Sequence, residues 1–137
     1  MRAAVGSLPP MLDPAVKKLA QGKNFAMITV HLPNGAASTQ VMWVDADDDH
    51  LIMNTEVHRA KYKALQADPR VTVTVWQLDD PYHYAEVRGR LESTETGPEA
   101  LAMIHRLSQK YTGHDYTNPI QSERVTLRIA PERQLAR

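Results

Sequence analysis

The sequence contains no cysteine, which excludes disulfide bonds, thiolate metal sites and thiol nucleophiles. It also lacks an excess of either charge, because sixteen Lys and Arg residues are balanced by sixteen Asp and Glu residues. A general nucleic-acid or membrane-surface binder would carry an excess of basic residues. No apolar run approaches the roughly 20 residues that a membrane span needs. We therefore expect a cytoplasmic protein that binds neither nucleic acid nor membrane.

The motifs of several enzyme classes are also missing. There is no Gly-x-Ser-x-Gly, no His-Glu-x-x-His, no Walker loop and no dinucleotide-binding glycine pattern. The six histidines show no spacing typical of metal ligands. The acidic segment at residues 45–49 lacks the glycine and the distal glutamate of an EF-hand, so a solvated turn is the better interpretation. We predict no metal site.

The length of 137 residues fits one domain. We expect it to span residues 11–137, after a flexible lead at residues 1–10. Alternating apolar residues predict six strands, at residues 25–32, 37–44, 50–55, 71–77, 82–95 and 124–130. Three helices are predicted at about residues 14–21, 60–67 and 97–111. Short strands joined mainly by hairpins indicate a mainly β fold, with a mostly antiparallel sheet that closes into a small barrel.

Local signals add detail to this arrangement. Asn34-Gly35 between apolar runs predicts a hairpin, and we expect the first three strands to form an antiparallel meander. Gly89 in mid-strand indicates a bulge or a barrel bend. Thr96 with Glu99 predicts a capping box for the last helix. That helix should bury a stripe of Leu101, Ile104, Leu107 and Tyr111. We expect residues 131–137 to trail off after the last strand.

Cations crowd the start of the predicted middle helix. They are His58, Arg59, Lys61 and Lys63. A helix N-terminus is partly positive and opposes each such charge by roughly 0.3–1 kcal/mol. Only Glu56 compensates locally. Free backbone N–H groups together with Arg and Lys suit a phosphate, whereas the alternative interpretation is a solvated basic face.

Four aromatic residues lie on strands near this helix, and two interpretations are open for them. They either flank a flat ring or pack in the barrel core and at an interface. The four residues are Trp43, Trp76, Tyr82 and Tyr84.

Short segments in a fixed order cover nearly the whole chain, from about residue 12 to residue 133. They are FAMIT (25–29), STQVMWVD (38–45), LIMNT (51–55), HRAK (58–61), DPRV (68–71), YHYAEVRG (82–89), KYTG (110–113) and ERVTL (123–127). With this order and spacing the chain resembles the split β-barrels of the flavin-reductase and pyridoxamine-phosphate-oxidase-like family. Within that family it most resembles the coenzyme F420-dependent reductases.

The resemblance implies an FMN-binding type of split barrel and a homodimer with cofactor sites at the subunit interface. Arg59 and Lys61 would hold the cofactor phosphate, and Thr55 would add a hydroxyl contact. The strand at residues 39–43 would lie along the ring, with Tyr82 and Tyr84 close by. The implied cofactor-binding residues are Thr39, Gln40, Val41, Met42, Trp43, Asn54, Thr55, Arg59, Lys61, Tyr82 and Tyr84.

The implied function is that of an oxidoreductase in which reduced F420, a deazaflavin, passes hydride to an unsaturated or conjugated small molecule. The proton would come from Tyr84 or from solvent. The alternatives are an FMN-binding, oxidase-like protein, a non-catalytic carrier or sensor of either cofactor, and a structural dimer without a ligand. Oxidases of this family that act on pyridoxamine phosphate have further basic residues near the C-terminus. Residues 133–137 show no counterpart, which argues against that activity.

Overall fold

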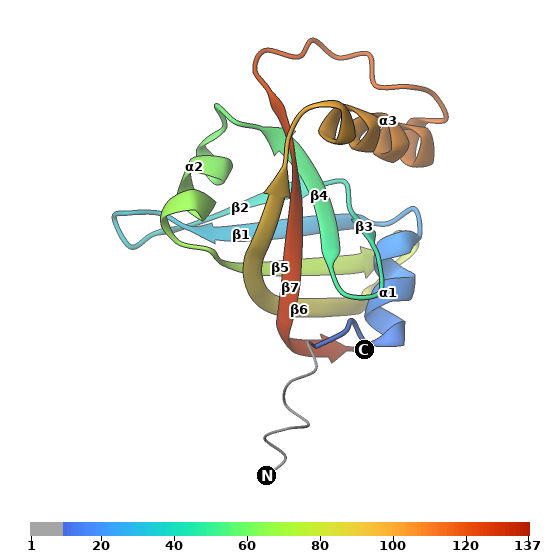
Figure 1. Cartoon of the computed structure of the whole chain (residues 1–137). Helices are drawn as coiled ribbons and strands as arrows, with labels where there is room; N and C mark the ends of the chain where they lie inside the picture. The colour runs from blue at the N-terminus through green and yellow to red at the C-terminus, as the bar shows by residue number, and fades with distance from the viewer. Residues whose placement is uncertain (1–9) are drawn as a thin grey trace.

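The computed structural model describes residues 10–137 (Figure 1), so the predicted lead lies outside the described residues except for Pro10. The described chain forms seven strands and three helices. The helices are α1 (Pro14–Gln21), α2 (Ala60–Ala67) and α3 (Pro98–Thr112). The strands are β1 (Phe25–His31), β2 (Ala37–Met42), β3 (Asp45–Ala46), β4 (Leu51–Glu56), β5 (Arg70–Gln77), β6 (Asp80–Glu95) and β7 (Arg124–Ala136).

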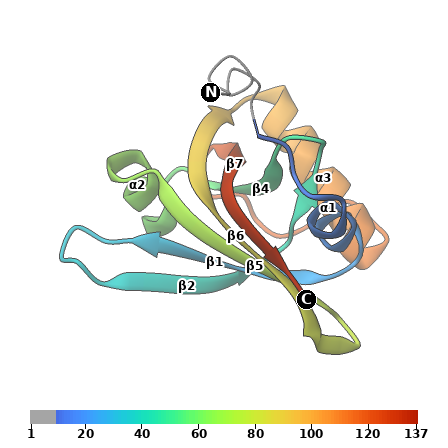
Figure 2. The same cartoon turned by 90° about the horizontal axis from the view of Figure 1, so that it is seen from below.

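All seven strands belong to one sheet in the order β2-β1-β5-β6-β7-β4-β3, and every neighbouring pair is antiparallel. The sheet is curled into a half-barrel. Figure 1 shows β1, β2 and β5 running across the view while β4 and β7 run down it, and the long strand β6 bends from one group to the other. Figure 2 shows β6 and β7 curving away from the layer of β1 and β2. The predicted mainly β, mostly antiparallel barrel is confirmed, with seven strands instead of six.

The predicted meander of the first three strands is wrong. The β1–β2 hairpin forms, with Asn34 Oδ1 accepting a hydrogen bond from the N–H of Ala36 at 2.9 Å. The chain then leaves β2 at Met42, and part of the predicted acidic turn becomes the short strand β3, which pairs with β4. Because β3 pairs with one edge of β4, β7 pairs with the other edge. β4 therefore lies far from β2 in the strand order.

The prediction that residues 131–137 trail off is also wrong, because β7 continues to Ala136 along the first half of β6. The bulge predicted at Gly89 is confirmed by a register shift between Arg88 and Gly89. A Cβ atom at Gly89 would lie 2.0 Å from the carbonyl oxygen of Ala130. Only glycine therefore lets β7 approach β6 this closely.

The start of α3 differs from the predicted capping box. Gly97, with φ of 74°, is the N-cap residue, and no side chain caps the helix. Because Gly97 takes the N-cap position, Thr96 falls outside the helix, and Glu99 accepts a hydrogen bond from Arg128 instead. One residue of the predicted buried stripe is not buried, because Leu101 is 42% exposed. The buried residues of α3 are Ala100, Met103, Ile104, Leu107, Ser108 and Tyr111.

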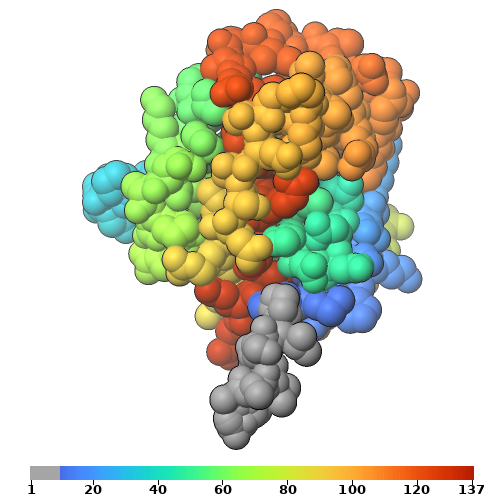
Figure 3. Space-filling view, viewed as in Figure 1, coloured from blue at the N-terminus to red at the C-terminus, as the bar shows by residue number. Residues whose placement is uncertain are grey.

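The other two helices begin and end as predicted, although Asp13 occupies the N-cap position of α1 without a side-chain capping bond. Alternate residues of β1, β5 and β6 fill the barrel with α1 and α2. A second apolar cluster lies under α3, where Ile104, Leu107 and Tyr111 pack with Trp43 and Tyr116. Figure 3 shows α3 and the loop after it covering one end of the molecule. None of the helices in residues 10–137 is long and apolar enough to cross a membrane.

Candidate functional site

The connection from β4 to α2 brings basic side chains to one end of the sheet. β4 is buried along its length and ends at Glu56, whose carbonyl accepts a hydrogen bond from the N–H of Arg59 at 3.0 Å. Arg59 is the N-cap residue of α2 and is exposed, whereas Lys61 is half-buried in the first turn. Lys63, one turn further on, is exposed. Arg59 and Lys61 therefore lie where the helix presents free N–H groups.

Lys61 lies among other cations. Burial lowers its pKa from the ordinary value of 10.5, and the charges of Arg59 and Arg124 lower it further. Neither Arg59 nor Lys61 forms a salt bridge within residues 10–137. Three basic side chains thus act on one another, and the acidic group Glu56 acts on Arg124 among them. This arrangement suits an anion better than it suits a solvated basic face.

Arg124, at the first position of β7, is the residue that sequence reasoning missed. Its side chain is only 9% exposed. Its Nε donates to Asn54 Oδ1 at 2.8 Å, and its guanidinium lies 5.2 Å from the ring centre of Tyr116. Burial lowers the pKa of Arg124, whereas Tyr116 and Glu56 raise it. The only hint in the sequence was its place in the segment ERVTL, because nothing local indicates that this arginine is buried.

Asn54 and Thr55 face a different environment from the one expected. Both are buried in β4. The amide of Asn54 donates to the carbonyl of Ala100 at 2.9 Å and to Thr126 Oγ1 at 3.2 Å, while its oxygen accepts from Arg124. Asn54 therefore orients Arg124. Direct contact of Asn54 or Thr55 with a cofactor stays a prediction.

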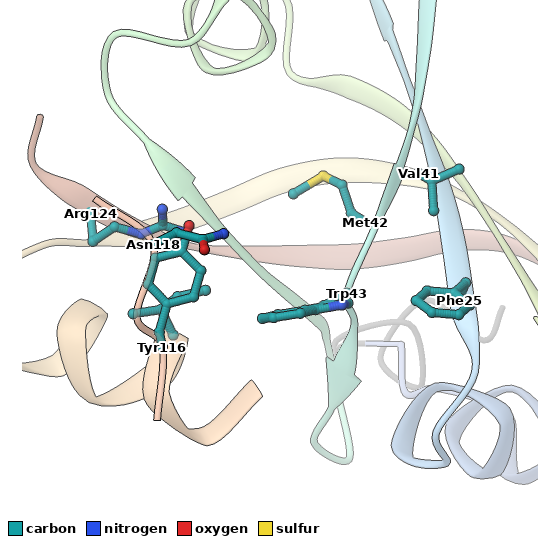
Figure 4. A pocket seen from close by; sticks show the side chains of 8 residues that line it. Phe25, Val41, Met42, Trp43, Tyr116, Asn118 and Arg124 are labelled. Carbon is teal, nitrogen blue, oxygen red and sulfur yellow. The ribbon is translucent and has the colours of Figure 1, made fainter. Parts of the chain in front are cut away.

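A cavity of about 280 Å³ opens beside Arg124. Figure 4 shows Arg124, Tyr116 and Asn118 on one side and Trp43, Met42, Val41 and Phe25 on the other. Ile104 completes the lining. Three of the predicted cofactor-binding residues of the strand at 39–43 thus line one cavity with a buried cation.

The aromatic wall of this cavity is held in place from behind. Trp43 stacks on Tyr111 with ring centres 5.2 Å apart and planes 4° apart, and Tyr116 meets Trp43 edge-on. Tyr111 in turn stacks on Phe25, and its hydroxyl donates to the carbonyl of Asn24. Burial raises the pKa of Tyr111 to about 12, so this hydroxyl keeps its proton. Trp43 is therefore positioned to present a fixed flat surface.

The structure places the remaining predicted residues elsewhere. Tyr82 and Tyr84 line a second hollow of about 420 Å³ on the outer face of the sheet, with Met27, Thr74, Trp76 and Pro81. Thr39 and Gln40 are exposed on the edge strand β2. Within one chain, the tyrosines and the basic cluster therefore do not share a cavity. Contact of these residues with a cofactor stays a prediction.

The residues present fit a flat cofactor that carries a phosphate. The basic side chains match the anion, and Trp43 with Met42 matches a ring. The cavity of about 280 Å³ is small beside the roughly 300–1,000 Å³ of typical ligand pockets. A single chain therefore offers room for only part of such a cofactor.

This curled antiparallel half-barrel with three helices is the flavin-binding split-barrel fold. The chain belongs to the pyridoxamine 5'-phosphate oxidase family, whose N-terminal family model matches residues 12–136. Members of this family are generally oxidoreductases. A search of curated proteins found no significant match.

Solved structures of similar proteins agree with this fold. An F420 reductase shares 25% of its sequence with the chain, with a TM-score of 0.79 and coverage of 90% of this chain and 98% of that one. A conserved hypothetical protein from Mycobacterium tuberculosis has 22% identity, a TM-score of 0.67 and coverage of 92% and 84%. A candidate pyridoxamine 5'-phosphate oxidase from Listeria innocua has 16% identity, a TM-score of 0.63 and coverage of 86% and 90%. The last two show the fold alone.

Proposed function

We propose that the protein is an oxidoreductase that uses reduced coenzyme F420 to transfer hydride to an unsaturated or conjugated small molecule. The observation that carries this proposal is the cluster of Arg59, Lys61 and Arg124, of which Arg124 lines a cavity walled by Trp43. The similarity to an F420 reductase over nearly the whole chain supports the choice of cofactor. Cytoplasmic location stays a prediction.

The roles of the chain's own residues follow from their positions. Arg59 and Lys61 hold the phosphate, and the N–H groups at the start of α2 face the same charge. Trp43, fixed by Tyr111, covers the ring and excludes water from it. The bound cofactor supplies the hydride. Tyr84 remains the predicted proton donor from the chain, with solvent as the alternative.

A homodimer is part of the proposal. The outer face of the sheet exposes apolar side chains, among them Met27, Val41 at 60% and Tyr82 at 89%. Exposed apolar surface of this kind marks interaction sites. A second copy packed on this face would bury these residues and enlarge the small cavity beside Arg124. The aromatic hollow with Tyr82 and Tyr84 would then join the site from the other subunit.

FMN is the alternative cofactor, and the family itself favours it, because a pyridoxamine 5'-phosphate oxidase model matches the chain. Both cofactors present a phosphate and a flat ring, so the basic cluster suits either one. A non-catalytic carrier of F420 or flavin would use the same residues. Binding without turnover of enones, quinones or tetrapyrroles would distinguish the carrier from the enzyme.

The first experiment compares cofactors by thermal shift. F420, FMN, FAD and NADPH are each titrated against the purified protein, and a ligand that binds the native state raises its melting temperature. We expect F420 to give the largest shift. A larger shift with FMN, together with a yellow protein as purified, would favour the alternative. No shift with any of the four would contradict the proposed function.

The second experiment removes the phosphate contacts. Arg59→Ala combined with Lys61→Ala should weaken F420 binding at least tenfold, because each charge-assisted hydrogen bond contributes roughly 1.5–3 kcal/mol. Fluorescence quenching of F420 measures the affinity. Lys63→Ala, on the same helix but exposed, is the matched control and should bind normally. Unchanged affinity in the double variant would show that the phosphate lies elsewhere.

A further inference from the structure

Arg124 is a buried charge with unused hydrogen-bonding capacity. A guanidinium carries five N–H donors. Here Nε donates to Asn54 at 2.8 Å, and Nη1 reaches Glu56 Oε2 only at 3.5 Å. The side chain of Tyr116 also hydrogen-bonds the guanidinium, so three of its five donors at most have partners among residues 10–137. Buried arginines are normally paired and hydrogen-bonded throughout, because an incompletely paired buried charge is costly.

The carboxylate next to Arg124 is already engaged by other groups. Glu56 is 2% exposed, and its Oε1 accepts hydrogen bonds from the N–H groups of Gln121 and Ser122, both at 2.7 Å. Burial alone would raise the pKa of Glu56, but these two N–H groups and the charges of Arg124 and His58 lower it below 4.5. Glu56 therefore anchors the end of the loop before β7 and neutralises Arg124 only in part.

Two more cations face the same place. Arg59 acts on the pKa of both Lys61 and Arg124, and Arg124 acts on that of Lys61. The three positive charges therefore lie close enough to repel one another, and Glu56, 3.5 Å from Arg124, is the acidic group that acts on Arg124. The side chain of Arg124 also lines the cavity that Trp43 closes on its other side (Figure 4). The side chain of Arg124 consequently borders the space where a ligand would lie.

We infer that Arg124 is a third ligand of the cofactor phosphate and that Asn54 and Glu56 are the positioning residues that aim it. The inference rests on the proposed function, because it concerns the same anion. The phosphate then lies between the start of α2 and the start of β7. It completes the hydrogen bonding of Arg124 and offsets the repulsion among the three cations.

The test uses ligand pairs that differ only in their phosphate. FMN is compared with riboflavin, and F420 with its deazaflavin chromophore that keeps the ribityl chain but lacks the phosphodiester. Arg124→Gln should weaken binding of FMN and F420 by about tenfold to a hundredfold, as expected for a charge-assisted hydrogen bond. Binding of the two phosphate-free ligands should change less than about twofold. Arg124→Lys should recover part of the lost affinity, since it keeps the charge.

Arg128→Gln is the matched control, because Arg128 lies on the same strand and pairs with Glu95 and Glu99 instead. It should leave all four affinities unchanged. Equal weakening of both members of a pair in Arg124→Gln would indicate a structural role only and would overturn the inference. Undiminished binding of FMN and F420 by Arg124→Gln would also overturn the inference. If Arg124→Gln does not fold, the same titrations are made with the double variant Arg124→Gln, Glu56→Gln. The second substitution removes the buried carboxylate that would otherwise be left without its arginine.

Inorganic phosphate separates this inference from the proposed function. If the wild-type protein binds none of the cofactors, the proposed function fails, but the anion site can still be measured. Thermal shift with phosphate, against chloride at equal ionic strength, should stabilise the wild type and not Arg124→Gln. Equal stabilisation of the two proteins, or none in the wild type, would overturn the role of Arg124.

Discussion

Two arginines on β7, Arg124 and Arg128, occupy contrasting environments although they are close in the sequence. Arg128 is 23% exposed and donates to two carboxylates, Glu95 at 3.0 Å and Glu99 at 3.2 Å. Arg124 is 9% exposed and has one carboxylate at 3.5 Å, with two cations nearby. The more deeply buried arginine is the less completely paired. Arg128 forms structural ion pairs that tie α3 and β6 to β7, whereas we propose that Arg124 belongs to a ligand site.

The partner carboxylates should therefore differ strongly in their effect on stability. Glu56→Ala removes the acceptor of two backbone N–H groups and leaves Arg124 uncompensated. We expect a loss of about 3–5 kcal/mol in the free energy of unfolding, typical of breaking a buried pair. Glu95→Ala, at an exposed residue, should cost only about 0–1 kcal/mol. Urea denaturation of both variants measures the difference. Equal losses would mean that the two arginines are paired alike.

The stability of the protein at acidic pH should also depend on the buried carboxylate of Glu56. The folded protein lowers the pKa of Glu56 below 4.5, so this carboxylate stabilises the fold fully above its unfolded pKa. The contribution is lost as the pH falls from about 4.5 through the lower folded pKa, because the unfolded chain takes up the proton first. We expect Glu56→Gln to flatten the fall in stability of the wild type in this acidic window. A variant with an unchanged acid profile would show that Glu56 is not held as a buried carboxylate.

The smallest expected effect concerns the repulsion within the cluster. The lowered pKa of Lys61 means that the fold disfavours its charged form, and this penalty applies at neutral pH. Lys61→Gln should therefore stabilise the ligand-free protein by about 0.3–1 kcal/mol while weakening cofactor binding. Lys63→Gln, beyond the first turn of α2, should change stability by less. Thermal denaturation without ligand measures both. A destabilised Lys61→Gln would mean that Lys61 has a protein partner in solution.

Local signals in the sequence predicted much of the fold. Asn34-Gly35 predicted the β1–β2 hairpin because that turn demands specific backbone angles, and Gly89 predicted the bulge because it lacks a side chain. The meander, by contrast, was wrong because strand order depends on which edges remain free after β3 pairs with β4. The capping box was wrong because Gly97 competed with Thr96 for the N-cap position.

The candidate site was predictable to a similar extent. Arg59 and Lys61 could be predicted as phosphate ligands from the sequence because cations are unfavourable at a helix start, which is a local argument, and their contact with a cofactor stays a prediction. Arg124 was not found, because its burial and its bond to Asn54 depend on the pairing of β4 with β7. Tyr82 and Tyr84 were predicted beside the ring, but one chain places them in a separate hollow. Their predicted role would require the proposed assembly of two chains.

The most direct measurement is a crystal structure of the protein with bound F420 or FMN. We predict that the phosphate oxygens lie within about 3 Å of nitrogen atoms of Arg59, Lys61 and Arg124, the distance of charge-assisted hydrogen bonds. Arg128 should keep its two carboxylates in the same structure. A phosphate bound elsewhere, with Arg59 and Lys61 in open solvent, would contradict the account.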